Sequence, residues 1–133
     1  MTAATKMEAS IEKLVAICFL VIGLSHILQP RAWVKFFIML REKGEVGSIL
    51  NGLLHFPLGA LIVSFHNVWH GIPIVVTIMV WGLVIKSLLY LTYPKHGMRV
   101  LSQVTVEKSW GFVVAGIVAV GLSGLIAFSL LNS

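Results

Sequence analysis

Residues 72–92, IPIVVTIMVWGLVIKSLLYLT, form an almost unbroken apolar stretch in which Lys86 is the one charged residue. A helix needs about 20 consecutive apolar residues to cross the hydrocarbon core of a bilayer, and this stretch has that length. Within lipid, an open-ended segment satisfies its backbone N–H and C=O groups only as a helix. The stretch therefore predicts a transmembrane helix.

Three further apolar runs flank this stretch: Leu14–Leu28, Ile49–Phe65 and Trp110–Leu131. The last run is long enough to cross a bilayer, and the first two become so if flanking residues such as Ile11 and Gln29 extend to the interface. We therefore expect an all-α fold. We expect this fold to be a four-transmembrane-helix bundle that forms a single integral membrane domain over residues 1–133.

The composition agrees with a membrane protein. Charged residues make up 11% of the 133 residues and hydrophobic residues 58%, whereas soluble domains average about 25% charged residues. Ten basic and five acidic residues are too few for a soluble surface or for a phosphate-binding surface. This excludes an ordinary soluble enzyme, a disordered chain and a nucleic-acid-binding domain. The single cysteine, Cys18, excludes a disulfide within these residues.

Two of the connections between the apolar runs resemble interfacial helices. The segment that follows Pro30 carries four basic residues within residues 31–47, and its apolar residues from Trp33 to Leu40 recur at helical spacing. Pro94 begins a weaker segment of the same kind, residues 94–109, with three basic residues. Proline favours the first position of a helix, so both segments are predicted to be amphipathic interfacial helices.

The distribution of Lys and Arg predicts the orientation. Residues 31–47 and 94–109 hold seven basic residues, and residues 66–71 hold no Lys or Arg. Because cytoplasmic loops are enriched in Lys and Arg, we expect these two basic loops to be cytoplasmic and both termini to lie outside. The expected location is a bacterial cytoplasmic (inner) membrane.

The two halves of the chain resemble each other. A shift of 64 residues superposes three pairs of identical residues, Pro30 and Pro94, Gly47 and Gly111, and Gly52 and Gly116. Each half reads as helix, proline, basic segment, glycine and helix. This predicts two parallel two-helix repeats, about residues 11–66 and 72–131. The alternative is that two-helix hairpins converge on this pattern.

Polar residues distribute unequally between the halves and mark a candidate site. Asn51, His55 and Lys86 stand where the other half has Ala115, Ala119 and Ile22. At a rise of about 1.5 Å per residue, His26, Asn51, His55 and Lys86 fall in one depth band, and Tyr90 lies one turn beyond Lys86. Asn51 and His55 also share a helix face. We therefore expect a polar intramembrane cluster for a ligand or ion, formed by Lys86, His55, Asn51, His26 and Tyr90.

Lys86 has no obvious acidic partner. The acidic residues are all expected in tails or loops: Glu8, Glu12, Glu42, Glu45 and Glu107. Lys86 is then neutral, bonded to Asn51 and carbonyls, or paired with a group that the chain does not encode. That group is an anion, a lipid phosphate, an acidic ligand or a partner subunit. A purely structural Lys86 stays an alternative, as does an interhelical hydrogen bond for Asn51 and His55.

Two further histidines give a second, separate candidate. His66 and His70 have the i, i+4 spacing of a metal-binding helix, but the short loop that contains them lacks acidic residues. A haem between His26 and His55 is a further geometric alternative. The sequence requires no cofactor, and it does not identify one.

Two stretches carry a family resemblance: IGLSHILQPRAWVKFF (residues 22–37) and NGLLHFPLGALIV (residues 51–63). They resemble small four-helix bacterial membrane proteins of the DoxX-like type. The hairpin over residues 66–94 also resembles a recurrent bacterial pattern, and the matching residues are Trp69, Trp81, Gly82, Lys86 and Pro94. The resemblance implies accessory, assembly or quinone-linked roles in a membrane.

These features lead to two functional hypotheses. The first is an accessory membrane protein whose polar cluster binds a lipid headgroup or an acidic or quinone-like small ligand, as a homo-oligomer or a subunit of a membrane complex. The second is an oligomeric channel or transporter for protons, anions or a small solute. An enzyme is less expected, because no Arg or acidic residue is predicted within the membrane.

Overall fold

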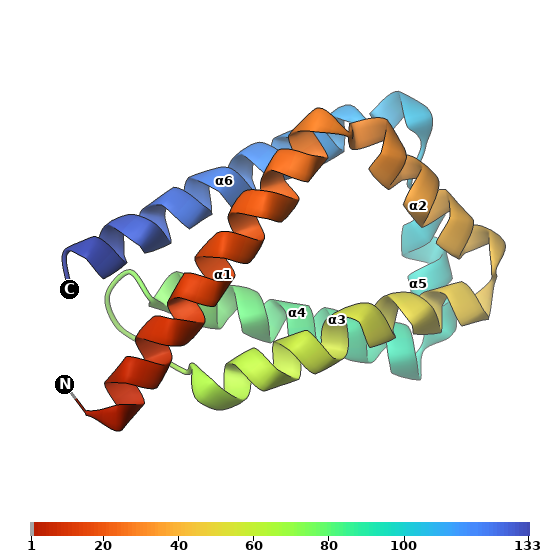
Figure 1. Ribbon diagram of the computed structural model, residues 1–133. Coiled ribbons are helices and arrows are strands. Elements are labelled where there is room, and N and C mark those ends of the chain that lie inside the picture. Colours follow the sequence, from red (N-terminus) through yellow and green to blue (C-terminus); the bar gives the residue numbers. More distant parts are fainter. Residues whose placement is uncertain (1) are drawn as a thin grey trace.

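The computed structural model describes residues 2–133, and these residues form helices and no strand. In chain order the helices are α1 (Ala3–Leu28), α2 (Pro30–Glu42), α3 (Glu45–Phe65), α4 (Ile74–Thr92), α5 (Pro94–Leu101), η1 (Val106–Lys108) and α6 (Trp110–Leu131) (Figure 1). The predicted all-helical fold is confirmed. Helices also form at both proline-initiated segments, as α2 and α5.

Four helical segments are long and apolar enough to span a membrane: Ala3–Leu28, Glu45–Phe65, Ile74–Thr92 and Val106–Leu131. They coincide with the four predicted runs, except that the first helix begins well before Leu14. Thr2 caps this helix, since its hydroxyl oxygen accepts the Thr5 N–H at 3.3 Å. The expectation that Glu12 lies in a tail was therefore wrong, because Glu12 is a buried residue of α1.

The long helices pack as two antiparallel pairs, α1 with α6 and α3 with α4 (Figure 1). Small residues bring each pair close together. A Cβ at Gly23 of α1 would lie 2.9 Å from the carbonyl oxygen of Gly116 in α6. A Cβ at Gly52 of α3 would lie 3.1 Å from the carbonyl oxygen of Ser87 in α4. Each helix pair is thus held at a distance that larger side chains do not allow.

The two helix pairs meet at the end that holds both chain termini and residues 66–73, which we call the terminal end (Figure 1). An apolar cluster there joins all four long helices, with buried members from α1, α3, α4 and α6: Val15, Ala16, Ile62, Val76, Val80 and Ile126. Away from this end the pairs diverge. The four spans therefore do not share one continuous core along their length.

Helices α2 and α5 lie at the opposite end, which we call the basic end. A second apolar cluster there contains Leu40 of α2, Tyr90 of α4 and Leu101 of α5. Arg41 of α2 donates a hydrogen bond from Nη1 to the Val104 carbonyl at 2.9 Å. The α2–α3 turn passes through Gly44, whose φ of 63° favours glycine. The basic end thereby bridges the two helix pairs.

Candidate functional site

The α3/α4 pair brings three of the predicted site residues together. Asn51 of α3 is 1% exposed and lies beside the Tyr90 hydroxyl of α4. The Lys86 ammonium lies 5.8 Å from the centroid of the Tyr90 ring, within the range of a cation–π contact. His55 lies one turn from Asn51 on α3 and is half-buried. Lys86, Tyr90 and Asn51 therefore form one connected group, with His55 adjacent.

Lys86 is exposed on the surface of the α3/α4 pair, near the middle of a span. The ion pairs among residues 2–133 are limited to one contact, between Glu12 and His66. Lys86 has therefore no carboxylate partner within the described chain. An ammonium group placed this way is open to an anion from outside the protein.

Asn51 leaves an acceptor unused. Its Oδ1 atom is buried and has no hydrogen-bond partner within the described residues. The neighbouring Ser48 hydroxyl is occupied, since it donates to the Tyr90 carbonyl at 3.1 Å. Buried polar atoms are almost always paired, so this unpaired amide oxygen sets Asn51 apart from the packed core.

His55, at the middle of α3, and His26, in the last turn of α1, share one bonding pattern. His55 Nδ1 lies 2.7 Å from the Asn51 carbonyl, and His26 Nδ1 lies 2.7 Å from the Ile22 carbonyl. Because a carbonyl only accepts, each Nδ1 carries the hydrogen. In the neutral ring the Nε2 lone pair is then the free acceptor. Both histidines are thus fixed in one tautomer by their own helices.

His26 belongs to a different cluster from Lys86. Its ring stacks on Trp33 at 4.2 Å between centroids and on Phe112 at 5.6 Å. Trp33 also donates from Nε1 to the Ser25 hydroxyl at 3.0 Å. His26 is therefore packed between rings of α2 and α6, and the predicted grouping of His26 with Lys86 is not formed by direct contact.

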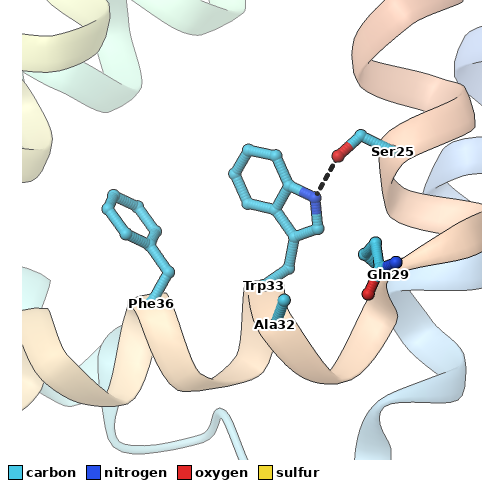
Figure 2. Close-up of a pocket in the computed structure, with 5 residues that line it drawn as sticks. All are labelled: Ser25, Gln29, Ala32, Trp33 and Phe36. Atoms are coloured by element: carbon cyan, nitrogen blue, oxygen red, sulfur yellow. Dashed lines mark hydrogen bonds between the residues drawn. The ribbon is translucent and has the colours of Figure 1, made fainter.

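A groove of about 360 Å³ opens beside Trp33 (Figure 2). Its walls come from the end of α1, the residue that follows it and the first turns of α2: Ser25, Gln29, Ala32, Trp33 and Phe36. Figure 2 shows the rings of Trp33 and Phe36 side by side on α2. Phe36 also packs against the cluster of Leu40 and Tyr90. The aromatic groove and the Lys86 group are therefore neighbours across the basic end.

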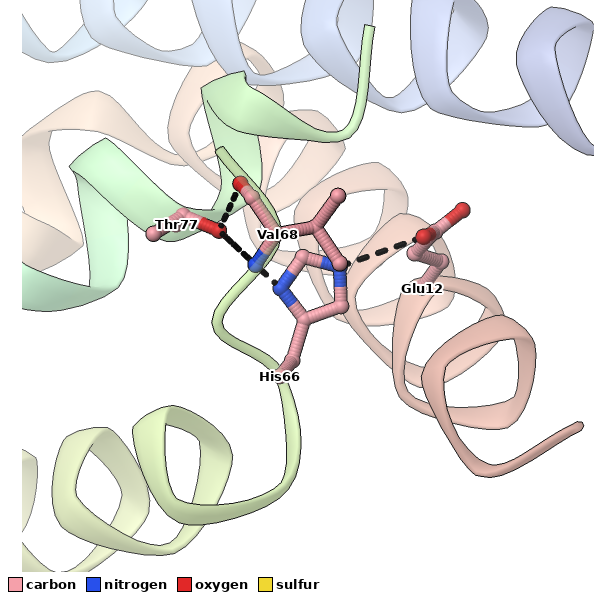
Figure 3. A network of polar contacts seen from close by, with 4 residues as sticks. All are labelled: Glu12, His66, Val68 and Thr77. Atoms are coloured by element: carbon pink, nitrogen blue, oxygen red, sulfur yellow. Dashed lines mark hydrogen bonds and ion pairs between the residues drawn. The ribbon is translucent and has the colours of Figure 1, made fainter. Parts of the chain in front are cut away.

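The two candidate metal ligands, His66 and His70, lie in different environments. His66 is fully buried, with Nε2 at 3.1 Å from Glu12 Oε1 and Nδ1 at 3.3 Å from the Thr77 hydroxyl (Figure 3). His70 is exposed. Within residues 2–133 no group of three His, Cys, Asp or Glu side chains is placed to hold a metal. Both ring nitrogens of His66 are thus engaged by the protein itself.

Comparisons with family models, with curated proteins and with solved structures find no match to this chain. The resemblance to DoxX-like proteins stays a prediction. The candidate site therefore rests on the geometry of its own residues.

Two features of the structure were not predicted from the sequence. One is the contact of Glu12 with His66, and the other is the stack of His26 with Trp33 and Phe112. A signal for the first exists, because Ile11 and Val15 flank Glu12 with the helical spacing of the apolar run. The partner of Glu12 lies 54 residues away, and no local pattern identifies it.

Proposed function

We propose that this chain is an integral membrane protein that binds the anionic headgroup of a membrane lipid at Lys86. Its role is that of a binding or accessory component rather than an enzyme. The observation that carries the proposal is an exposed ammonium group within a spanning helix, with no carboxylate partner among the described residues. A phosphate group supplies the missing charge and accepts several hydrogen bonds at once.

The depth of Lys86 suits a headgroup. Lys86 precedes the last residue of α4, Thr92, by six positions, which corresponds to about 9 Å along the helix axis. Long basic side chains reach an interface from such depths by extending along the apolar surface. A lipid phosphate drawn slightly inward at the basic end can therefore meet the ammonium group.

The internal repeat that we propose from the sequence gives independent support for a binding role of Lys86. At the 64-residue shift, the close approach of Gly23 to Gly116 corresponds to that of Ser87 to Gly52. The contact of His26 with Phe112 likewise corresponds to that of Tyr90 with Ser48. We interpret these paired contacts as two copies of one helix-packing arrangement.

The two helix pairs differ where the polar residues lie. The α3/α4 pair has Lys86, Asn51 and His55 at the positions where the α1/α6 pair has Ile22, Ala115 and Ala119. If the same packing forms with apolar residues, the polar side chains are not needed to hold the helices together. Their presence in one copy alone is what a binding role predicts.

We propose that the basic end faces the cytoplasm of a bacterial cell. Exposed bases gather there on α2, α5 and η1: Arg31, Lys35, Lys95, Arg99 and Lys108. A positive end favours the cytoplasmic leaflet and its anionic lipids. Single cysteines at Ser102 and Asn132, each in a Cys18→Ala chain, test this with a membrane-impermeant maleimide. We expect labelling of position 102 in inverted vesicles and of position 132 in right-side-out cells; the reverse pattern contradicts the orientation.

Native mass spectrometry tests the proposed lipid site. Purified protein is placed in phosphatidylcholine nanodiscs that contain phosphatidylglycerol, and retained phosphatidylglycerol is measured after release. We expect Lys86→Leu to lose the retained lipid and Lys86→Arg to keep it. Lys35→Leu is the matched control, because Lys35 is an exposed base at the basic end.

Two outcomes contradict the lipid proposal. One is equal lipid retention by the wild type and Lys86→Leu. The other is loss of lipid in Lys35→Leu to the same degree, which indicates general electrostatic attraction. An added arm with inorganic phosphate distinguishes the sources of the anion, since a site for free phosphate releases the lipid when phosphate is added and a headgroup site does not.

A further inference from the structure

The terminal end carries two exposed tryptophans that the proposed lipid site does not use. Trp69 of the α3–α4 connection donates from Nε1 to Asn67 Oδ1 at 3.0 Å, and Trp81 of α4 donates from Nε1 to the same oxygen at 3.2 Å. Trp69 is 57% exposed and Trp81 is 39% exposed. We call these two side chains the indole pair. One amide oxygen therefore ties the connection to helix α4.

The two hydrogen bonds fix the orientation of the Asn67 amide. An indole Nε1 only donates, so each tryptophan needs an acceptor, and the side chain of asparagine offers its oxygen alone for that purpose. The polar edge of each indole is therefore turned toward Asn67. The surface that the indole pair leaves exposed is consequently the apolar part of its rings.

Trp81 lies on a face of α4 that the rest of the protein leaves uncovered. Ile78 and Ile85 stand three residues before it and four residues after it, so the three side chains share one side of the helix. Both isoleucines are 56% exposed. Helix α4 is long and apolar enough to span a membrane, so we expect this face to meet acyl chains. Helical side chains lean toward the helix N-terminus, and the Trp81 ring thus leans from this face toward the terminal end.

The connection itself leaves few polar groups to hydrate. Residues 66–73 contain no Lys, Arg, Asp or Glu. The N–H and the carbonyl of Val68 bond to the Thr77 hydroxyl at 3.0 and 2.7 Å, and the His66 side chain is fully buried. An irregular segment enters an apolar layer at lower cost when the protein satisfies its polar groups. The connection is therefore suited to the edge of a bilayer.

An exposed base marks the membrane surface at the same level. Glu12 of α1 contacts His66 at 3.1 Å, so the connection lies level with this part of α1. The next residue, Lys13, is exposed and lines an apolar hollow with Leu130 and Leu131 at the end of α6. Lysines near the ends of spans extend to the interface, where tryptophan is also enriched. The connection thus stands at the boundary between acyl chains and headgroups.

We infer that Asn67 and the indole pair form an interfacial clamp, which holds the α3–α4 connection in the surface layer of the bilayer at the terminal end. The partner of this surface is phospholipid, at the level where acyl chains meet headgroups. Indole N–H groups at an interface ordinarily bond to polar groups outside the apolar layer. Here Asn67 is their acceptor, so the rings can lie among the upper parts of the acyl chains. The inference rests on the proposed placement in a membrane and is independent of the Lys86 site.

Fluorescence of Trp69 alone tests the clamp. Trp33, Trp81 and Trp110 are changed to Phe, which keeps the bond from Trp69 to Asn67. The purified protein is placed in nanodiscs of phosphatidylcholine brominated at defined positions along its chains. We expect bromines near the headgroup end of the chains to quench Trp69, and iodide in the aqueous phase to have little effect. Quenching by iodide without quenching by the chain bromines overturns the inference, and it is also the result expected if a partner protein covers Trp69 in the cell.

A second chain, with Trp81 as its one tryptophan, separates the clamp from insertion into the membrane. Quenching of Trp81 by the chain bromines shows that α4 lies in lipid, whatever the position of the connection. Quenching of Trp81 without quenching of Trp69 overturns the clamp alone. Absence of quenching in both chains contradicts the proposed membrane placement as well.

Asn67→Ala, made in the chain that keeps Trp69, tests the role of the amide. The variant removes the acceptor of the indole N–H, which then bonds to headgroup oxygens or water. We expect the emission of Trp69 to shift to longer wavelength and its quenching by the chain bromines to fall. Asn132→Ala is the matched control, because the Asn132 amide bonds to the Phe128 carbonyl at 2.8 Å and not to an indole. Equal quenching of Trp69 in the two variants overturns the role of Asn67.

Discussion

Gly23 and Gly116 lie against each other where α1 packs on α6. A Cβ added at Gly23 would lie 2.9 Å from the Gly116 carbonyl oxygen, and a Cβ at Gly116 would lie 2.6 Å from the Gly23 carbonyl oxygen. Contacts this short against backbone force the two helices apart. The pairing of α1 with α6 therefore depends on the absence of side chains at these two positions.

Gly116→Val is expected to destabilise the α1/α6 pair by about 1–3 kcal/mol, the usual cost of overpacking a close contact. Unfolding in mixed micelles of increasing denaturing detergent measures the change. Gly124→Val on the same helix is the control, because no atom lies within 4 Å of a Cβ added there. Equal destabilisation of both variants contradicts the role assigned to the Gly23–Gly116 contact.

Lys86→Leu is expected to leave the protein at least as stable as the wild type. A basic residue at the centre of a membrane helix costs about 2.5–3.5 kcal/mol on insertion scales, and Lys86 makes no ion pair within the described chain that would be lost. The same detergent titration, carried out on delipidated protein, checks this. A marked loss of stability indicates instead that Lys86 has a structural role.

Trp33→Ala is expected to weaken the attachment of α2 to α1. The change removes the hydrogen bond to Ser25 and the stack on His26. Each such aromatic contact contributes about 0.5–1.5 kcal/mol beyond its buried area. Trp110→Ala is the control, because Trp110 is 66% exposed. Hydrogen exchange of the α2 amides should rise in Trp33→Ala and stay unchanged in the control.

Thr77→Val is expected to destabilise the terminal end although the shape of the side chain is nearly kept. It leaves the N–H and carbonyl of Val68 and the Nδ1 of His66 without their partner. Each buried group left unpaired costs about 1–3 kcal/mol. Thr92→Val is the control, because the Thr92 hydroxyl bonds within its own exposed helix end. Thermal unfolding of the two variants should therefore differ, and similar melting temperatures contradict the prediction.

Much of the fold could be predicted because its signals are local. The four spans follow from run length and hydropathy, and α2 and α5 begin at the two prolines that the sequence marks. The candidate site could be predicted only in part. Asn51, Lys86 and Tyr90 do meet, since i, i+4 spacing and matching depth are readable along a helix. His26 does not join them directly, because depth alone says nothing about which side of the fold a helix faces.

The sequence by itself determined that the chain is helical and apolar enough to span a membrane, since lipid leaves the backbone no other open-ended way to satisfy its hydrogen bonds. The tertiary structure alone decided that α1 pairs with α6 and α3 with α4, and that Glu12 is buried against His66. These outcomes depend on close packing and on hydrogen-bond partners far apart in the chain. Neither leaves a periodic signal within a single helix, so only the packed structure reveals them.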